Sequence, residues 1–193
     1  MDISLIIPSI RPHKLINLYY SCYSAIKKYK FHIIIIGPFD LPEQLISKDN
    51  ITYIKEYGNV SRATQIGILN CKSDIYYCTT DDCVFAEDSI DVAVDLLKLY
   101  NKKEIIINGR FTENGQSKPI LFWKVKSNPD LCLKGINPHW DCTLQPIMYK
   151  DYYEKFGGLD CRFEYSNYAW HDLMFRIQKN GGRILNSPTE ICL

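Results

Sequence analysis

The sequence lacks long hydrophobic stretches, and it lacks an excess of either charge. Its apolar runs are short, such as residues 33–36, whereas a membrane-spanning helix needs ~20 apolar residues. Lysine and arginine number 23 against 22 aspartates and glutamates, which gives a formal net charge of +1. Nucleic-acid-binding domains normally carry a basic excess. These absences argue against a transmembrane helix and against a dedicated nucleic-acid-binding protein.

The N-terminus lacks the basic segment and long apolar stretch of a secretion signal. The eight cysteines are scattered, with neither a C-x-x-C pair nor the spacing of a zinc site. A chain of 193 residues can also bury a sufficient core without cross-links. We therefore expect reduced, mostly buried thiols and a cytoplasmic location.

Two glycine-rich phosphate loops are also missing, since neither G-x-G-x-x-G nor G-x-x-x-x-G-K-[ST] occurs. The first is typical of dinucleotide-binding Rossmann domains and the second of P-loop enzymes. Both classes are therefore disfavoured. Any phosphate bound by this chain must be neutralised in another way, and a metal ion held by acidic residues is one candidate.

The sequence does contain an alternation of strand-like and helix-like segments. Apolar, β-branched runs favour buried strands, and apolar residues at three- and four-residue steps favour helices. The predicted strands are residues 3–7, 31–36, 51–55, 75–79, 104–108, 120–125 and 143–149. The predicted helices are residues 13–29, 61–71, 87–100, 151–156 and 170–180. Residues 126–141 are predicted to form a long loop, because they contain prolines and a glycine and show little periodicity.

Alternation over the first hundred residues is the signature of βαβ units and a parallel sheet. We expect an α/β fold with a mostly parallel central sheet flanked by helices, followed by a less regular second half. No repeat or linker interrupts the chain, which predicts a single domain over residues 1–193.

In an open parallel sheet, ligands bind outside the carboxyl ends of the strands. The loops after the first four predicted strands are therefore the candidate site. Their notable polar and turn residues are Pro8, Ser9, Arg11, Asp40, Asn59, Arg62, Thr80, Asp81 and Asp82.

Asp81 and Asp82 are adjacent carboxylates at a predicted strand end. Such a pair repels itself unless a hard divalent cation or strong hydrogen-bond donors lie beside it. The pattern is consistent with a Mg²⁺ or Mn²⁺ site, and equally with a polar turn, where aspartates are common.

Arg62 lies at the start of a predicted helix, where the helix dipole disfavours a cation by ~0.3–1 kcal/mol. We expect a compensating partner for it. That partner is either a ligand or one of the nearby acids, Glu56 and Asp40.

The last predicted helix opens at Trp170, which places Asp172 in its first turn. A carboxylate aimed from there into a cleft could serve as a general base. The alternative is an ion pair with Arg176, four residues on. His171 lies ~100° around the helix axis from Asp172 and therefore faces another way.

These segments occur in a recognisable order. The sequence resembles family-2-type glycosyltransferases of the GT-A fold, which use nucleotide-sugar donors. The matching segments are 4–9 (SLIIPS), 58–63 (GNVSRA), 77–82 (YCTTDD), 156–163 (FGGLDCRF), 171–176 (HDLMFR) and 182–184 (GRI).

The resemblance implies a role for each matching residue. Nucleotide-sugar contacts fall to Pro8, Ser9, Arg11, Asp40, Asn59, Arg62, Thr80 and Asp81. Asp82 would bind Mn²⁺ or Mg²⁺, as in the family's D-x-D-type motif. The base would be Asp172, with His171 and Asp160 as alternatives, because the common Glu-Asp pair has no clean counterpart.

The resemblance further implies an inverting transfer of sugar from a nucleotide diphosphate, most commonly UDP, to a hydroxyl of a glycan or other acceptor. Residues 1–100 would bind the donor and residues 101–193 the acceptor. Trp123, His139 and Trp140 would suit an acceptor wall, although the tryptophans could equally be core anchors. The sequence ends soon after the last predicted helix, so we expect one domain of a larger protein.

Two other functions remain open. A sugar nucleotidyltransferase would share the sheet and the acids, but it normally needs a basic, glycine-rich loop near the N-terminus, and residues 9–14 contain no glycine. A domain that binds a nucleotide-sugar or glycan without turnover is the second alternative, favoured by the missing Glu-Asp pair.

Overall fold

The computed structural model describes the chain except for residues 101–103, 114, 119–120, 125–138 and 164–165. Within the described part, seven strands form one sheet in the order β11-β5-β10-β4-β1-β2-β3. The strands are β1 (Ile3–Pro8), β2 (Phe31–Gly37), β3 (Ile51–Lys55), β4 (Ile75–Cys78), β5 (Ile105–Asn108), β10 (Pro146–Tyr149) and β11 (Arg183–Asn186). Only β10 among them runs antiparallel to its neighbours. The expected mostly parallel α/β sheet is confirmed.

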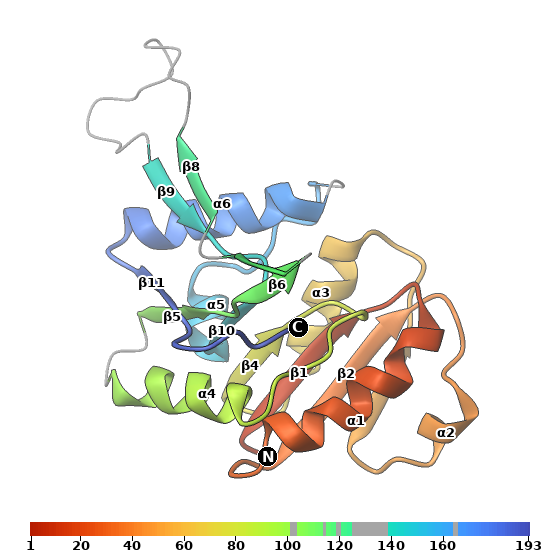
Figure 1. The fold of residues 1–193 in the computed structure, drawn as a ribbon. Coiled ribbons are helices and arrows are strands. Elements are labelled where there is room, and N and C mark those ends of the chain that lie inside the picture. Colours follow the sequence, from red (N-terminus) through yellow and green to blue (C-terminus); the bar gives the residue numbers. More distant parts are fainter. Residues whose placement is uncertain (101–103, 114, 119–120, 125–138, 164–165) are drawn as a thin grey trace.

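Helices cover both faces of this sheet (Figure 1). Helices α1 (Leu15–Ala25) and α4 (Ser89–Leu99) pack on one face, and α3 (Val60–Leu69), α5 (Lys150–Lys155) and α6 (Ser166–Lys179) pack on the other. A short 3₁₀ turn (Pro12–Lys14) precedes α1, and α2 (Glu43–Ile46) lies between β2 and β3. The central strands are therefore enclosed on both sides, which explains their continuous apolar runs.

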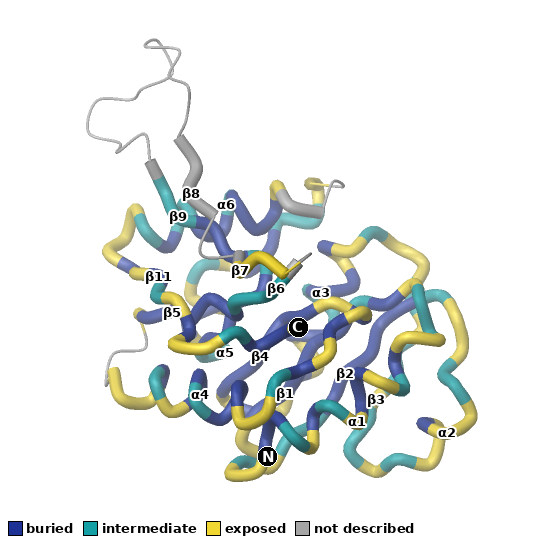
Figure 2. The backbone as a smooth tube through the Cα atoms, in the orientation of Figure 1, coloured by how far each residue is buried: buried dark blue, intermediate teal, exposed yellow. Residues whose placement is uncertain are grey.

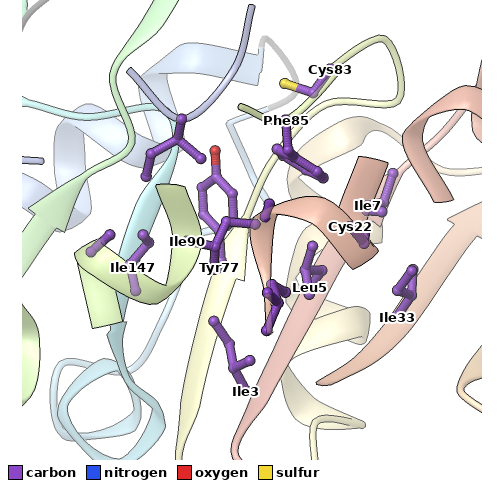
Figure 3. Packing of buried hydrophobic residues seen from close by; sticks show 14 of the residues in the cluster. Ile3, Leu5, Ile7, Cys22, Ile33, Tyr77, Cys83, Phe85, Ile90 and Ile147 are labelled. Atoms are coloured by element: carbon purple, nitrogen blue, oxygen red, sulfur yellow. The ribbon is translucent and has the colours of Figure 1, made fainter. Parts of the chain in front are cut away.

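The core alternates between the two faces along each strand. Ile3, Leu5 and Ile7 of β1 belong to the cluster under α1 and α4, whereas Ile6 belongs to the cluster under α3 and α6. Figure 3 shows the first cluster, where β1 side chains meet Cys22 of α1 and other apolar side chains. Burial of each such side chain contributes roughly 1.5–3 kcal/mol. In Figure 2 the central strands are buried, whereas many residues in the outer loops and helices are exposed.

Two hairpins extend from the second half of the chain. One pairs β6 (Phe111–Glu113) with β7 (Gln116–Lys118), and the other pairs β8 (Leu121–Lys124) with β9 (His139–Cys142). Strand β9 is held against α6, because the Gln178 amide accepts from the Asp141 N–H at 3.0 Å and donates to the Asp141 carbonyl at 2.7 Å. The predicted loop over 126–141 was therefore wrong at its end, while residues 126–138 lie outside the described part.

The last helix differs from its prediction in a way that matters for the site. It begins at Ser166 rather than Trp170, and its first turn contains no acid. Asp172 consequently lies in the second turn. Strand β11 follows this helix and was not predicted, because it is a four-residue edge strand with a single fully buried residue, Ile184.

The expectation that all thiols are reduced was wrong for one pair. Cys83 and Cys192 form a disulfide across 109 residues, with Cα atoms 5.4 Å apart. The backbone brings them together, because Phe85, two residues after Cys83, forms an antiparallel β-bridge with Cys192. The other cysteines in the described part are free, namely the buried Cys22, Cys71, Cys78 and Cys142 and the partly exposed Cys161.

No helix in the described part is long and apolar enough to cross a membrane.

Candidate functional site

Two adjoining cavities lie at the carboxyl ends of the parallel strands. The first has a volume of about 300 Å³ and is lined by residues after β1, β2, β3 and β4. The second has a volume of about 160 Å³ and extends toward α6. Both are lined by Pro8, Val60 and Thr80, so they form one continuous crevice. The crevice is where ligands bind in open α/β sheets.

The two sets of lining residues differ in polarity. The first cavity is lined by Pro8, Ser9, Ile10, Arg11, Ile36, Gly37, Pro38, Glu56, Gly58, Val60, Ala63, Thr80 and Asp81. The second is lined by Pro8, Val60, Ser61, Thr64, Cys78, Thr79, Thr80, Leu144 and Trp170, none of which is charged. A ligand with a charged part and a neutral part would match this division.

Asp81 is the hub of the loops that surround the first cavity. Its side chain is only 3% exposed, yet its carboxylate accepts five hydrogen bonds. Oδ2 accepts from Ser9 Oγ at 3.0 Å and from the backbone N–H groups of Ile10 (3.0 Å) and Arg11 (2.9 Å). Oδ1 accepts from Arg11 Nε at 2.9 Å and from Arg11 Nη2. The buried charge is therefore compensated, and it fixes the loop after β1 to the end of β4.

Arg11 bridges the two adjacent aspartates. Its Nη1 lies 2.9 Å from Oδ2 of Asp82. The side chains of Arg11 and Asp82 are each 42% exposed. Hydrogen bonds from the guanidinium to Asp81, followed by the charge of the two carboxylates, raise the pKa of Arg11. The sequence pattern required either a metal ion or strong hydrogen-bond donors beside the two aspartates. Arg11 is such a donor.

The carboxylates as arranged do not fit the predicted divalent cation. A carboxylate has about four lone-pair sites, and five donors already occupy those of Asp81. Asp82 shares one oxygen with Arg11. No group of three or more histidine, cysteine, aspartate or glutamate side chains in the described part could hold a metal ion. Mn²⁺ or Mg²⁺ at Asp82 remains a prediction.

Arg62 and Asn59 are explained by the start of α3. Asn59 is the N-cap, and its Oδ1 accepts from the Arg62 N–H at 2.9 Å. The Arg62 side chain is 61% exposed, and its Nε lies 3.3 Å from Glu56 Oε1. Of the partners considered for Arg62, the structure shows Glu56. Neither Asn59 nor Arg62 lines the crevice, whereas Glu56 does.

Gly58 completes this turn at a position where a side chain would displace those of Arg62 and Glu56. A Cβ there would lie 2.7 Å from Arg62 Cδ and 3.0 Å from Glu56 Oε1. The Gly58 N–H also donates to Glu56 Oε1 at 2.8 Å. This glycine lets Glu56, Arg62 and the backbone meet at the cavity wall.

Asp40 lies apart from the crevice. Its exposed carboxylate pairs with Lys55 Nζ at 2.7 Å, and it lines neither cavity. From the same loop, Gly37 and Pro38 line the first cavity instead. A Cβ on Gly37 would overlap the carbonyl oxygen of Ser9, so this glycine permits the close approach of two loops.

The predicted base residues lie outside the crevice, with Asp172 and His171 on α6 and Asp160 in the loop before it. Asp172 lines a third cavity of about 600 Å³ together with Asp160, Arg162 and Arg176. It accepts from Arg176 Nε at 2.9 Å and Nη2 at 2.6 Å, which confirms the predicted ion pair. Hydrogen bonds from Arg162 lower the pKa of Asp160 to about 2, which makes that carboxylate a weaker proton acceptor.

His171 is buried beside β9. Trp140 packs edge-on against it at a ring-centroid distance of 6.3 Å, and against Phe175 at 5.6 Å. Burial lowers the pKa of His171, which favours the neutral imidazole. His171 lines neither cavity of the crevice.

Of the residues predicted to bind an acceptor, His139 and Trp140 lie in strand β9 rather than in the predicted loop. Trp140 packs on α6 as described, which fits the core-anchor alternative. His139 begins β9 and Trp123 lies in β8, but their side chains are outside the described part.

The structure therefore gathers Pro8, Ser9, Arg11, Thr80 and Asp81 in one crevice, with Asp82 attached through Arg11. Sequence reasoning missed Trp170 at the crevice, because its spacing with Leu173 marked it only as a core residue. It also considered Glu56 only as a partner of Arg62. The sequence holds no signal that would separate a residue on a cavity wall from a core residue or from a member of an ion pair.

Comparison with known proteins shows the fold. No protein-family model and no curated protein matches the chain. Among solved structures, the chain is similar to S. aureus TarS 1–349, with a TM-score of 0.69 and 13% identity over 100% of this chain and 60% of that one. The same protein in complex with UDP gives a TM-score of 0.69 at 12% identity, again over 100% and 60%. The chain thus spans less than two thirds of the TarS structures and shares their GT-A-like α/β fold.

Proposed function

We propose that this chain is a glycosyltransferase that uses a nucleotide-diphosphate sugar, with UDP as the nucleotide. One observation carries the proposal. Four strand-end loops of a GT-A-like fold form a crevice with a charged part and a neutral part, and the similar TarS structure was obtained in complex with UDP. The order of the family-like sequence segments supports the same conclusion.

The crevice suits a nucleotide-sugar in a defined direction. The first cavity offers apolar surface from Ile36, Pro38 and Ala63, which suits a nucleoside. Its charged lining residues are Arg11, Glu56 and Asp81, of which the Arg11 guanidinium suits the phosphates. The second cavity, bounded by Trp170, suits the sugar, because aromatic faces pack on sugar rings and hydroxyl groups meet the polar residues Ser61 and Thr64.

The reaction we propose is a single displacement. The acceptor hydroxyl oxygen attacks the anomeric carbon, the bond from that carbon to the diphosphate oxygen breaks, and the configuration inverts. The hydroxyl proton passes to a general base. Asp172 is the proposed base and His171 the alternative. Helix α6 reaches the crevice through Trp170, two residues before Asp172, and catalytic hydrogen bonds often tighten only in the substrate complex.

A screen of nucleotides tests the donor part of this proposal. UDP, GDP, ADP and CMP would each be tested for thermal stabilisation of the protein. A ligand at 100 times its Kd adds ~2.7 kcal/mol, and each kcal/mol raises the midpoint by ~2–4 °C in a protein of this size. We expect stabilisation by UDP. Stabilisation by none of the four would overturn the proposal.

A matched pair of variants locates the binding. Gly58→Val fills the first cavity wall and should abolish stabilisation by UDP. Gly181→Val serves as the control, because a Cβ at Gly181 meets nothing within 4 Å; its positive φ of 88° makes it a strained substitution as well. A UDP effect that survives Gly58→Val would place the nucleotide elsewhere.

One observation favours a binding domain without turnover as the second candidate. Neither Asp172 nor His171 lines the crevice, and Asp172 is held by Arg176. Product analysis after incubation with a UDP-sugar separates the two functions. Release of free sugar or transfer to an acceptor supports the enzyme, and UDP-sugar binding with intact donor after prolonged incubation supports the binding domain.

A further inference from the structure

We propose that Arg11 takes the place of the divalent cation at Asp81 and Asp82, so that nucleotide binding by this chain needs no divalent metal. The nucleotide part of this inference rests on the proposed function. The part that concerns the metal rests only on the contacts of these three side chains.

The first step is the geometry of the bridge. The guanidinium donates to Asp81 Oδ1 through Nε at 2.9 Å and also through Nη2, and it pairs with Asp82 Oδ2 through Nη1 at 2.9 Å. One cationic group thus contacts both carboxylates, which is what a bridging metal ion would otherwise do.

The second step is the saturation of Asp81. Besides Arg11, its carboxylate accepts from Ser9 Oγ and from the N–H groups of Ile10 and Arg11. A metal ion bound to Asp81 would have to displace some of these donors, two of which are backbone groups in a loop that the sheet holds in place. Ser9 itself is bonded to β2, through its N–H and the Ile36 carbonyl at 2.8 Å.

The net charge of the three side chains bears on whether a cation would bind them. The formal charges of Arg11, Asp81 and Asp82 sum to −1. Without Arg11 the pair would carry −2, which is the charge that one divalent cation neutralises. A cation added to the intact triad would instead face the guanidinium at close range. Removal of Arg11 should therefore create a metal site that the natural chain does not have.

Arg11 keeps N–H donors that the two aspartates do not use. A guanidinium has five N–H donors, and three take part in the contacts with the two aspartates. The two others remain on a side chain that is 42% exposed and lines the first cavity. Because arginine binds phosphate oxygens well through paired N–H groups, a nucleotide phosphate in this cavity can contact Arg11 directly.

The test measures Mn²⁺ binding first, without any nucleotide. Loss of the free Mn²⁺ signal in electron paramagnetic resonance would be followed for the natural chain, for Arg11→Ala and for Arg11→Ala with Asp82→Asn. We expect the single variant to bind Mn²⁺ at least about tenfold more tightly than the natural chain, because Asp81 Oδ1 and the Asp82 carboxylate lose their guanidinium partner, and the double variant to lose that gain. Lys55→Ala is the matched control, since it frees only one carboxylate, that of Asp40.

Tight Mn²⁺ binding by the natural chain would overturn the proposal, and this measurement is decisive even where Arg11→Ala fails to fold. Calorimetric titration of the natural chain with UDP follows, once with EDTA and once with Mn²⁺. Equal affinity in both supports the proposal, and affinity that requires Mn²⁺ overturns it. Absence of UDP binding in both buffers would refute the proposed function instead. The Mn²⁺ titration would still decide whether Arg11 takes the place of a divalent cation.

Discussion

Two regions of the molecule contain an aspartate paired with an arginine, and they differ in how the pair is built. At the crevice, Asp81 is 3% exposed and joins segments 70 or more residues apart. On α6, Asp172 is 31% exposed and pairs with Arg176 four residues away on the same helix. The first pair joins loops around a cavity, whereas the second lies within one helix, from which Arg176 also donates to the carbonyls of Phe156 and Gly158. The same two residue types thus join distant segments in one region and lie within a single helix in the other.

The largest effect we expect comes from Asp81→Asn. An amide in place of the carboxylate presents N–H donors to groups that are themselves donors, and it leaves Arg11 without its main partner. Breaking a buried ion pair costs about 3–5 kcal/mol. Asp82→Asn, at a 42% exposed side chain, should cost at most about 1 kcal/mol. Urea unfolding of the two variants measures the difference, and equal losses would contradict the role of Asp81 as the hub.

The next largest effect concerns the Cys83–Cys192 disulfide. It joins the C-terminal end of the chain to the residue that follows Asp82. Replacement of both Cys83 and Cys192 by serine opens a loop of 109 residues in the unfolded chain. Loss of a native disulfide typically costs about 2–4 kcal/mol. Thermal unfolding should also respond to a reducing agent in the natural chain but not in the double variant. An unchanged midpoint on reduction would show that the two thiols are not joined.

A smaller effect is expected from Asp172→Asn. Exposed ion pairs four residues apart on a helix contribute ~0.3–0.5 kcal/mol, and this pair is 31% exposed on each side, so the midpoint should move only slightly. If the proposed base role is correct, turnover of a UDP-sugar falls by ~10²–10⁴-fold while donor affinity is kept. His171→Asn is the comparison. Full turnover in Asp172→Asn together with loss in His171→Asn would assign the base to the histidine.

The smallest effect is a pH dependence of stability from His171. Burial holds the pKa of His171 below its usual 6.5 in the folded state, so the unfolded chain binds more protons in that range. The contribution of His171 is complete above the unfolded pKa and is lost as pH falls through the folded pKa. We expect unfolding midpoints of the natural chain to fall more between pH 8 and pH 5 than those of His171→Gln. Parallel curves would contradict this.

The crevice side of the fold could be predicted because its strands are covered on both faces. Residues 51–55 were predicted as a strand and form β3, and the run 31–36 lies within β2. Since parallel strands end at one edge, the loops after β1 and β4 could be expected to meet. The partners within that edge could not, because nothing in the sequence ties Arg11 to Asp81 across 70 residues.

The α6 side was harder to predict. Residues 166–169 lack a periodic apolar pattern, so the helix start was placed at Trp170 and Asp172 was assigned to a first turn that it does not occupy. The disulfide was missed for a related reason. Cys83 and Cys192 are far apart in sequence, and their encounter depends on how the C-terminus returns to the sheet.

Nuclear magnetic resonance of the ¹⁵N-labelled chain, titrated with UDP in the presence of EDTA, tests the central claim most directly. Binding in the crevice without metal should shift the amide signals of Ser9, Arg11 and Gly58, which border the first cavity, and leave Asp160 and Arg162 beside the third cavity unchanged. Shifts confined to the third cavity, or shifts at the crevice that appear only after Mn²⁺ is added, would contradict the account.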